Sequence, residues 1–323
     1  MSKGETLNCV SNTKFRSDGF NTLYENDEIL AGLHSVSEPD HSLSQLMFFA
    51  QMKDSNISFW RVHRSFPRVY PTINFRPAMK AHFLTRLYIL LSAIYYTLSI
   101  SFLAILDASL GKLTRKKANI RLHSWAGQLL QLVRASYRVK HNKPIKLAQG
   151  RSYILMSNHQ SFYDIPLLFM TIPEGSSLRM ISKKELFRVP IWGRGMKTAE
   201  FISIDRSDHD KSVESLEVAK DKMKSGIMIY VAPEGTRSRD GKLREFKKGG
   251  FLLAIQTESI IIPIGLRGTE RVMPPDTWDF SLGQKIEAHV GTHIDASNYS
   301  IEGCDTLMQE VRAQILSLSQ KPE

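Results

Sequence analysis

Apolar residues in the second half of the chain follow two alternating patterns. Short apolar runs, typical of buried strands, alternate with stretches in which apolar residues recur every three or four positions, as on one face of a helix. The strand-like runs are Tyr153–Ser157, Arg179–Ser182, Glu200–Ile204, Ile227–Ala232, Ile260–Ile264 and Ile286–Val290, and the helical spacing is clearest at 210–224 and 304–319. This alternation predicts an α/β domain with a mixed sheet, which we place at 141–323.

The longest apolar stretch lies upstream, at Leu87–Leu106, and contains no charged residue. About twenty residues in a helix span roughly 30 Å, the thickness of the bilayer hydrocarbon. The stretch therefore suits a membrane-spanning helix, a monotopic helix in one leaflet or a buried core helix. Cationic residues flank it on both sides, so charge alone does not fix its orientation.

Residues 118–138 carry a second helical pattern, with large apolar side chains three or four positions apart. The stripe consists of Leu122, Trp125, Leu129, Leu132, Val133 and Tyr137. It can pack on the domain, on the preceding helix or on a membrane, and we favour core packing. We interpret 81–140 as a membrane-associated helical segment.

Residues 1–80 are rich in Ser, Asn, Asp and Glu and show little periodicity. They predict a polar, flexible extension without a secretory signal. At 60–80, arginines are interleaved with aromatic residues. Such a stretch is either solvated or forms a belt at the lipid headgroups.

Net charge bears on what the protein binds. The 323 residues include 43 Lys and Arg against 32 Asp and Glu, a formal charge of +11. Such a surface favours anionic lipid headgroups or nucleic acid, but the basic residues form no recognised nucleic-acid-binding module, so no nucleic acid is expected. The two cysteines, Cys9 and Cys304, lie far apart, which fits a reducing compartment and predicts no metal site.

The first candidate chemistry lies at 158–164, where a histidine precedes an aspartate by five residues. On one continuous helix the two side chains would diverge, but at a turn from strand to helix they can meet. Asn158 and Pro166 favour such a turn. A carboxylate on one imidazole nitrogen leaves the other free as a base, so His159 and Asp164 are candidate catalytic residues. The alternative is a helix cap beside a turn histidine.

The second candidate chemistry is a Pro-Glu-Gly-Thr-Arg-Ser turn after another apolar run. Gly235 permits a tight turn. Arg237 offers a planar fork for phosphate, with Thr236 and Ser238 as further donors. Glu234 is suited to accept a hydrogen bond from a substrate hydroxyl. The alternative is a surface turn with a solvated arginine.

A third candidate is Arg206, which follows the strand-like run at Glu200–Ile204. Ligands of open α/β sheets gather near the carboxyl ends of strands, so this arginine would bring a cation there. The alternative is an ion pair with Asp205. The sequence has no Gly-x-Ser-x-Gly turn around a serine, so the histidine and aspartate suit activation of a substrate hydroxyl.

In this order, the motifs resemble those of the glycerolipid acyltransferase family. The four matching segments are 158–164, Phe201–Arg206, Pro233–Ser238 and Ile261–Ile264. The third matches its family motif letter for letter, whereas the second lacks a glycine that often stands somewhat before its arginine. The likeness covers roughly residues 145–270 and does not reach 1–80.

The resemblance implies a mixed-sheet domain of the glycerolphosphate acyltransferase type, preceded by two membrane-docking helices. The best-known member acylates 1-acylglycerol-3-phosphate to phosphatidic acid, with acyl-CoA or acyl carrier protein as donor and no metal or other cofactor. By this resemblance His159 is the general base and Asp164 holds it. The residues implied in binding the acceptor are Arg206, Glu234, Gly235, Thr236, Arg237 and Ser238.

Other readings stay open at this stage. The acceptor could be glycerol-3-phosphate, a lysophospholipid or a lyso-ornithine lipid. From a different class, the chain could be a non-catalytic protein that binds lipid or nucleic acid. We expect membrane attachment at the inner (cytoplasmic) membrane, with the catalytic domain facing the cytoplasm. The sequence does not fix the oligomeric state.

Overall fold

The computed structural model describes residues 79–141, 145, 147–148, 150–173, 175–205 and 209–320. The expected polar extension therefore lies outside the described residues, apart from Met79 and Lys80. The chain divides into two units after Pro71, and the description below concerns the second unit, Thr72–Glu323.

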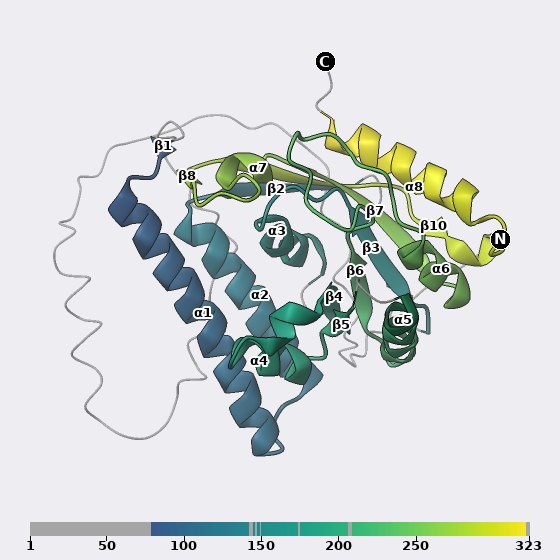
Figure 1. Cartoon of the computed structure of the whole chain (residues 1–323), viewed down its shortest axis with the longest axis horizontal. Coiled ribbons are helices and arrows are strands. Elements are labelled where there is room, and N and C mark those ends of the chain that lie inside the picture. Colours follow the sequence, from purple (N-terminus) through teal and green to yellow (C-terminus); the bar gives the residue numbers. More distant parts are fainter. Residues whose placement is uncertain are drawn as a thin grey trace, which may run out of the picture. The chain divides into compact units, whose positions relative to one another are not determined.

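The described residues contain an eight-stranded sheet, in the order β2-β9-β7-β3-β6-β4-β5 with β10 beside β7 (Figure 1), and a separate two-stranded sheet of β1 and β8. The strands of the larger sheet are β2 (Ser136–His141), β3 (Tyr153–Ser157), β4 (Leu178–Lys183), β5 (Ile202–Ile204), β6 (Met228–Val231), β7 (Ile260–Arg267), β9 (Lys285–Val290) and β10 (Ile294–Asp295). The strands from β7 to β5 run parallel, whereas β9 runs antiparallel to β7. The predicted mixed sheet is confirmed.

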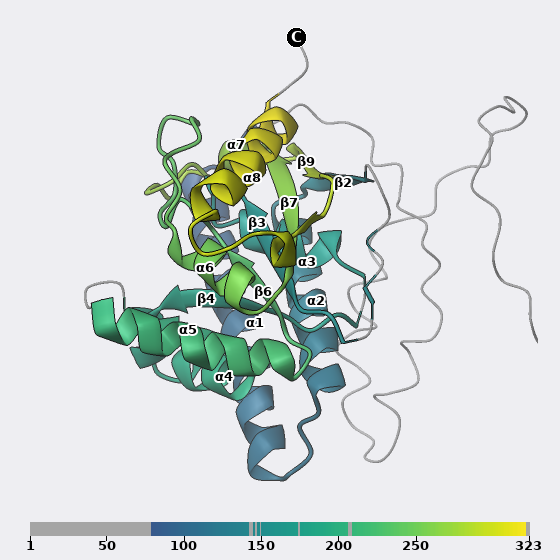
Figure 2. The same ribbon diagram turned by 90° about the vertical axis from the view of Figure 1, so that its right-hand side faces the viewer.

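Helices cover both faces of this sheet. They are α1 (Phe83–Ser109), α2 (Arg115–Leu132), α3 (Asp164–Thr171), α4 (Trp192–Thr198), α5 (His209–Lys224), α6 (Gly249–Gln256), α7 (Thr269–Val272) and α8 (Cys304–Ser319). The shorter elements are β1 (Met79–Lys80), β8 (Ser281–Leu282) and the 3₁₀ turns η2 (Lys184–Arg188) and η3 (Ala296–Asn298). Figures 1 and 2 show α1, α2 and α3 on one side of the sheet and α5, α6 and α8 on the other.

Each face of the sheet has its own hydrophobic core because successive strand residues point to opposite sides. In β3, Leu155 belongs to the core beneath α2 and α3, whereas Ile154 and Met156 belong to the core beneath α5, α6 and α8. All five residues of β3 are buried. The centre of the sheet is therefore fixed from both sides, and the loop that follows β3 starts from a rigid base.

The expected helix at 118–138 is wrong at its C-terminal end. The helix α2 stops at Leu132, Arg134 has a left-handed backbone (φ 53°), and Tyr137 lies in β2, which pairs with β9. The positive φ turns the chain out of the helix, and pairing with β9 then draws the following residues into the sheet. The sheet thus begins at Ser136, ahead of the domain boundary that the sequence suggested.

Helices α1 and α2 form a hairpin that lies against the domain. Asp107 of α1 pairs with Lys117 and Arg121 of α2, and Trp125 donates a hydrogen bond to Thr97 Oγ1 at 3.0 Å. In the described residues, α1 is the single helix long and apolar enough to cross a membrane. Only Ile89, Ser101 and Ala104 of α1 are buried, which excludes the interpretation of this stretch as a buried core helix.

The outward face of α1 is strongly apolar. Its exposed large apolar residues are Phe83, Leu84, Leu87, Tyr88, Leu91, Ile94, Tyr95, Phe102, Leu103 and Leu106. On the inner side, Ser101 contacts Gly195 of α4 so closely that a Cβ at Gly195 would come within 2.5 Å of the Ser101 Cβ. One side of α1 is thus held by the domain and the other is presented to the surroundings.

Candidate active site

The turn that follows β3 is anchored to the neighbouring strand β7. Asn158 Nδ2 donates to the Leu266 carbonyl at 2.9 Å, and the Leu266 amide donates to Asn158 Oδ1 at 2.7 Å. The side chain thus continues the ladder of the sheet by one step where the backbone leaves it. Sequence reasoning treated Asn158 only as a turn former, although an amide directly after a buried strand was a signal of this role.

His159 and Asp164 meet at this turn, as the sequence predicted. Asp164 begins α3, its side chain is fully buried, and its Oδ2 lies 2.8 Å from His159 Nδ1. The same oxygen accepts from the Gln160 and Ser161 amides at 2.7 and 2.9 Å. A carboxylate acceptor places the proton on Nδ1, so Nε2 of the 20% exposed imidazole is the basic nitrogen.

Glu234 connects the two loops of the site. Its Oε1 accepts from the His159 amide at 2.8 Å and its Oε2 from the Arg244 amide at 2.9 Å, and the residue is 3% exposed. Burial raises the pKa of this carboxyl, and the two amide hydrogen bonds oppose the rise. The Ser238 amide adds a second connection to the His159 carbonyl, at 2.8 Å. Both carboxylate oxygens thus accept hydrogen bonds from backbone amides, and the substrate contact expected from the sequence stays a prediction.

Ser238 is likewise engaged within the protein. It is 4% exposed, and its hydroxyl lies 2.9 Å from Asp240 Oδ1 and 2.8 Å from the Lys242 carbonyl. Gly235 has φ +72°, a backbone that favours glycine, and Thr236 is exposed. Glu234 and Ser238 therefore fix the loop from inside, whereas Gly235, Thr236 and Arg237 line the adjoining cavity.

The guanidinium of Arg237 lies over an aromatic ring of the histidine turn. Its guanidinium carbon is 3.9 Å from the Phe162 ring centroid, and its Nη2 is 3.3 Å from Asp276 Oδ1. The site therefore brings a cation to the turn that carries His159, although Arg237 and His159 are far apart in the sequence. The other predicted cation, Arg206, lies outside the described residues.

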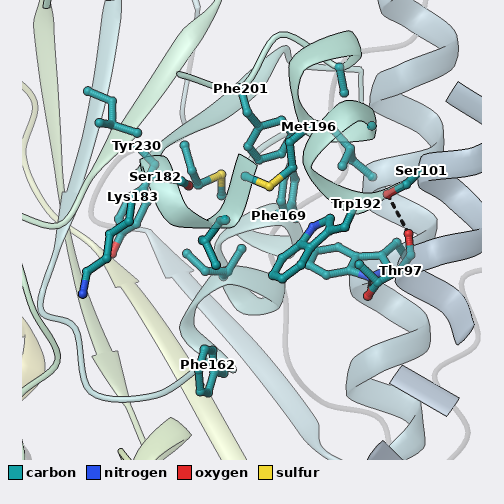
Figure 3. Close-up of a pocket in the computed structure, with 18 of the residues that line it drawn as sticks. Thr97, Ser101, Phe162, Phe169, Ser182, Lys183, Trp192, Met196, Phe201 and Tyr230 are labelled. Atoms are coloured by element: carbon teal, nitrogen blue, oxygen red, sulfur yellow. Dashed lines mark hydrogen bonds between the residues drawn. The ribbon is translucent and has the colours of Figure 1, made fainter. Parts of the chain in front are cut away.

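A cavity of about 540 Å³ adjoins these residues. His159, Gly235, Thr236 and Arg237 line it together with apolar side chains of α1 to α4 and of the sheet. Figure 3 shows Phe169, Trp192, Met196 and Phe201 projecting into it, with Thr97 and Ser101 of α1 on the side opposite Lys183. The site thus joins a base and a cation to a largely apolar chamber.

Lys183 is a lining residue that sequence reasoning did not select. It ends β4, so it stands at the same carboxyl edge of the sheet as the histidine turn. Its position after a strand-like run was the available signal. Among the described residues, no group of three or more His, Cys, Asp or Glu side chains is arranged to hold a metal ion.

Comparison with known proteins agrees with this architecture. The model of the Acyltransferase family matches residues 138–267. A chloroplastic 1-acyl-sn-glycerol-3-phosphate acyltransferase of Arabidopsis thaliana is 39% identical over 50% of this chain and 43% of its own length. The 1-acyl-sn-glycerol-3-phosphate acyltransferase of Limnanthes douglasii is 31% identical over 55% of this chain and 66% of its own.

The fold has a counterpart among solved structures. The 1-acyl-sn-glycerophosphate acyltransferase PlsC from Thermotoga maritima is similar with a TM-score of 0.60 and 24% identity, over 73% of this chain and 92% of that one. The chain spans less than half the length of the first curated relatives it matches, at 43%, 34% and 37%. The matched residues contain the histidine turn, the Arg237 loop and the strands that position them, so residues 138–267 form a domain of the acyltransferase type.

Proposed function

We propose that this protein transfers a fatty acyl group from an acyl thioester to the free hydroxyl of 1-acylglycerol-3-phosphate, giving phosphatidic acid. The observation that carries the proposal is the buried carboxylate on His159 Nδ1, beside Arg237 and an apolar cavity. The names of the relatives support the same reaction. Acyl-CoA or acyl carrier protein is the donor, and no metal or other cofactor takes part in the steps below.

Transfer begins with His159 Nε2, which takes the proton of the acceptor hydroxyl as its oxygen attacks the thioester carbonyl. Asp164 stabilises the imidazolium that forms and keeps the ring in the required tautomer. The carbon–sulfur bond then breaks, and the imidazolium returns the proton to the leaving thiolate. The acyl group passes directly to the acceptor without an acyl-enzyme intermediate.

Arg237 holds the acceptor phosphate, with Lys183 and Arg206 as further cations and Thr236 as a donor. The planar guanidinium matches two phosphate oxygens at once, and its stack on Phe162 limits its orientations. Glu234, Gly235 and Ser238 act by holding the loop in shape. The phosphate contacts place the acceptor hydroxyl at His159.

The apolar cavity receives an acyl chain. Each methylene moved out of water is worth roughly 0.8 kcal/mol, so an apolar chamber beside the base retains a long chain during transfer. Because α1 and α2 form part of the cavity wall, the helical hairpin contributes to the substrate site as well as to membrane attachment.

The protein docks on a membrane through the outward face of α1. Its inner face lies on α4 and lines the cavity, which favours a monotopic position in one leaflet over a full crossing. On this view, α1 and α2 are the membrane-docking part of the expected segment 81–140. The catalytic domain expected at 141–323 also includes β2, and it faces the cytoplasm from the inner (cytoplasmic) membrane. Lysophosphatidate and phosphatidate both partition into bilayers, so docking brings the site to its substrate.

The test is acyl transfer from radiolabelled long-chain acyl-CoA to lysophosphatidate in mixed micelles, with wild type and His159→Ala in parallel. We expect the variant to lose roughly 10²–10⁴-fold or more in rate, because the general base is gone. The matched control is His289→Gln, since His289 also pairs with a carboxylate (Glu287, 2.9 Å) but does not line the cavity. A folded His159→Ala protein with the wild-type rate would refute the mechanism.

A further inference from the structure

The loop between α7 and β8 brings a carboxylate onto the phosphate-binding arginine. Asp276 Oδ1 lies 3.3 Å from Arg237 Nη2, and Asp276 Oδ2 lies 2.7 Å from Arg239 Nε. One carboxylate thus bridges two arginines of the same loop. Asp276 has φ +58°, a left-handed backbone that aspartate and asparagine accept more readily than most residues. The loop conformation therefore holds this carboxylate toward the arginines.

The two ion pairs are unequal. The contact to Arg239 is shorter, and the Arg239 side chain is 80% exposed, whereas that of Arg237 is 21% exposed and lies on Phe162. Within the described residues, Arg237 Nη1 is buried without a hydrogen-bond partner. The Arg237 side chain is therefore held in place with one of its hydrogen-bond donors unpaired. The Asp276 carboxylate can remain paired with Arg239 when it leaves Arg237.

On the basis of the function proposed above, we propose that Asp276 is an internal competitor for the acceptor phosphate at Arg237. When the phosphate binds, Asp276 leaves Arg237 and stays on Arg239. The residue thereby weakens the hold of the site on anions and eases release of phosphatidate, which carries the same phosphate. It sets the affinity and charge preference of the acceptor site and takes no part in proton transfer.

Charge preference follows from Coulomb repulsion, which grows with the charge of the ligand. A phosphate monoester carries close to two negative charges at neutral pH, whereas a phosphodiester carries one. Asp276 consequently opposes the binding of lysophosphatidate more strongly than that of lysophosphatidylglycerol. It therefore narrows the difference between the affinities of the site for these two acceptors.

The first test compares wild type with Asp276→Asn in mixed micelles. Asparagine keeps the left-handed backbone, so the loop should fold unchanged. We expect KM for lysophosphatidate to fall by up to about fivefold, the most that an exposed ion pair is worth, with no rise in kcat. The fall should be smaller for lysophosphatidylglycerol. An unchanged KM for lysophosphatidate in an active, folded variant would overturn the proposal.

The control is Asp279→Asn, in the same loop. Asp279 is 55% exposed against 49% for Asp276, and it pairs with Arg86 instead of the site arginines. We expect its KM for lysophosphatidate to equal that of wild type. An equal fall in both variants would mean that general loop charge, rather than competition at Arg237, causes the effect.

Arg239→Gln should act in the opposite direction, because it leaves Asp276 with Arg237 alone. We expect KM for lysophosphatidate to rise about two- to threefold in this variant and to stay unchanged when the same substitution is added to Asp276→Asn. A further rise in the double variant would show that Arg239 holds phosphate itself, and would overturn its role as the alternative partner of Asp276.

A binding experiment separates this inference from the proposed reaction. Inorganic phosphate should raise the melting temperature of Asp276→Asn at lower concentrations than it does for wild type. If lysophosphatidate is not acylated by either protein, the proposed function fails, but the phosphate titration still decides the competition. Identical titrations in the two proteins would refute the competitor role.

Discussion

At the scale of single residues, Asp164 organises the whole histidine turn. One oxygen of this buried carboxylate faces the imidazole and two backbone amides, so the position of the ring and the path of the chain depend on the same atom. Glu234, which lies on the Arg237 loop, joins this loop to the histidine turn by accepting a hydrogen bond from the His159 amide. Two buried carboxylates therefore fix the site.

Asp164→Asn tests the role of this charge. An amide oxygen can still accept from the backbone, but the side chain no longer stabilises an imidazolium and can hold the wrong tautomer. We expect kcat to fall by about 10⁴-fold, as for the equivalent change in a serine protease triad, with little change in KM. Circular dichroism checks that the variant is folded. A loss of less than tenfold would show that the carboxylate has only a structural role.

Single residues also show which contacts of the site a sequence motif can predict. The sequence predicted that His159 and Asp164 meet, because a turn was the only local geometry that allowed it, and the distance of 2.8 Å confirms this contact. It gave no indication that Glu234 binds the His159 amide or that Phe162 stacks on Arg237. Both contacts join separate loops, and their side-chain directions depend on how β3 and β6 pair.

At the scale of elements, α1 meets α4 at a contact where only glycine fits. A Cβ on Gly195 would lie 2.5 Å from the Ser101 Cβ and 2.7 Å from its Cα. Both residues line the cavity, so the same contact holds the hairpin and closes the chamber. The packing of α1 and the shape of the substrate site are therefore coupled.

Gly195→Val should push α1 away from α4 and open the cavity wall. We expect a lower melting temperature, by the equivalent of about 1–3 kcal/mol for overpacking, and reduced transfer in micelles. Gly127→Ala in α2 is the control, because its Cβ would meet nothing within 4 Å and alanine favours a helix by about 1 kcal/mol. The coupling would be disproved by a Gly195→Val protein with wild-type activity and melting temperature.

Elements also show where pattern and structure agree. Every strand-like run contains a strand, although β5 begins only at Ile202, because Glu200 has a left-handed backbone (φ 68°). Pro263 lies where the partner of β7 changes from β9 to β10, and its carbonyl accepts from the Gly291 amide at 2.9 Å. Proline lacks a backbone N–H donor, and Pro263 thus lies at a position where the hydrogen-bond ladder on this side of β7 is interrupted. The short helix α4 was not predicted, because about two turns give too little periodicity to distinguish a helix from a loop.

At the scale of the whole molecule, the exposed apolar face of α1 indicates where the protein binds. A contiguous apolar face of this extent on a soluble surface marks a site of interaction, and membrane lipid suits both its chemistry and the proposed substrate. The formal charge of +11 adds attraction to anionic headgroups. Apolar contact should dominate, since salt screens only the electrostatic part.

Leu91→Ser combined with Tyr95→Ser tests this surface, since these residues are 57% and 65% exposed. Wild type should sediment with anionic vesicles and resist a high-salt wash, whereas the double variant should wash off with an unchanged melting temperature. Val218→Ser, at a 47% exposed apolar residue of α5 on the other face of the sheet, should behave as wild type. Equal retention of all three proteins would exclude α1 as the docking surface.

The sequence by itself determined the alternation of the main strands and helices, the apolar length of α1, and the turn at which a base meets its carboxylate. These properties depend on neighbouring residues, whose periodicity and turn chemistry are legible along the chain. Tertiary structure alone decided that Glu234 braces the histidine loop, that Asp276 reaches Arg237, and that α1 closes the cavity. Such contacts join distant segments, and the parallel pairing of the strands and the close packing of α1 on α4 set which side chains meet.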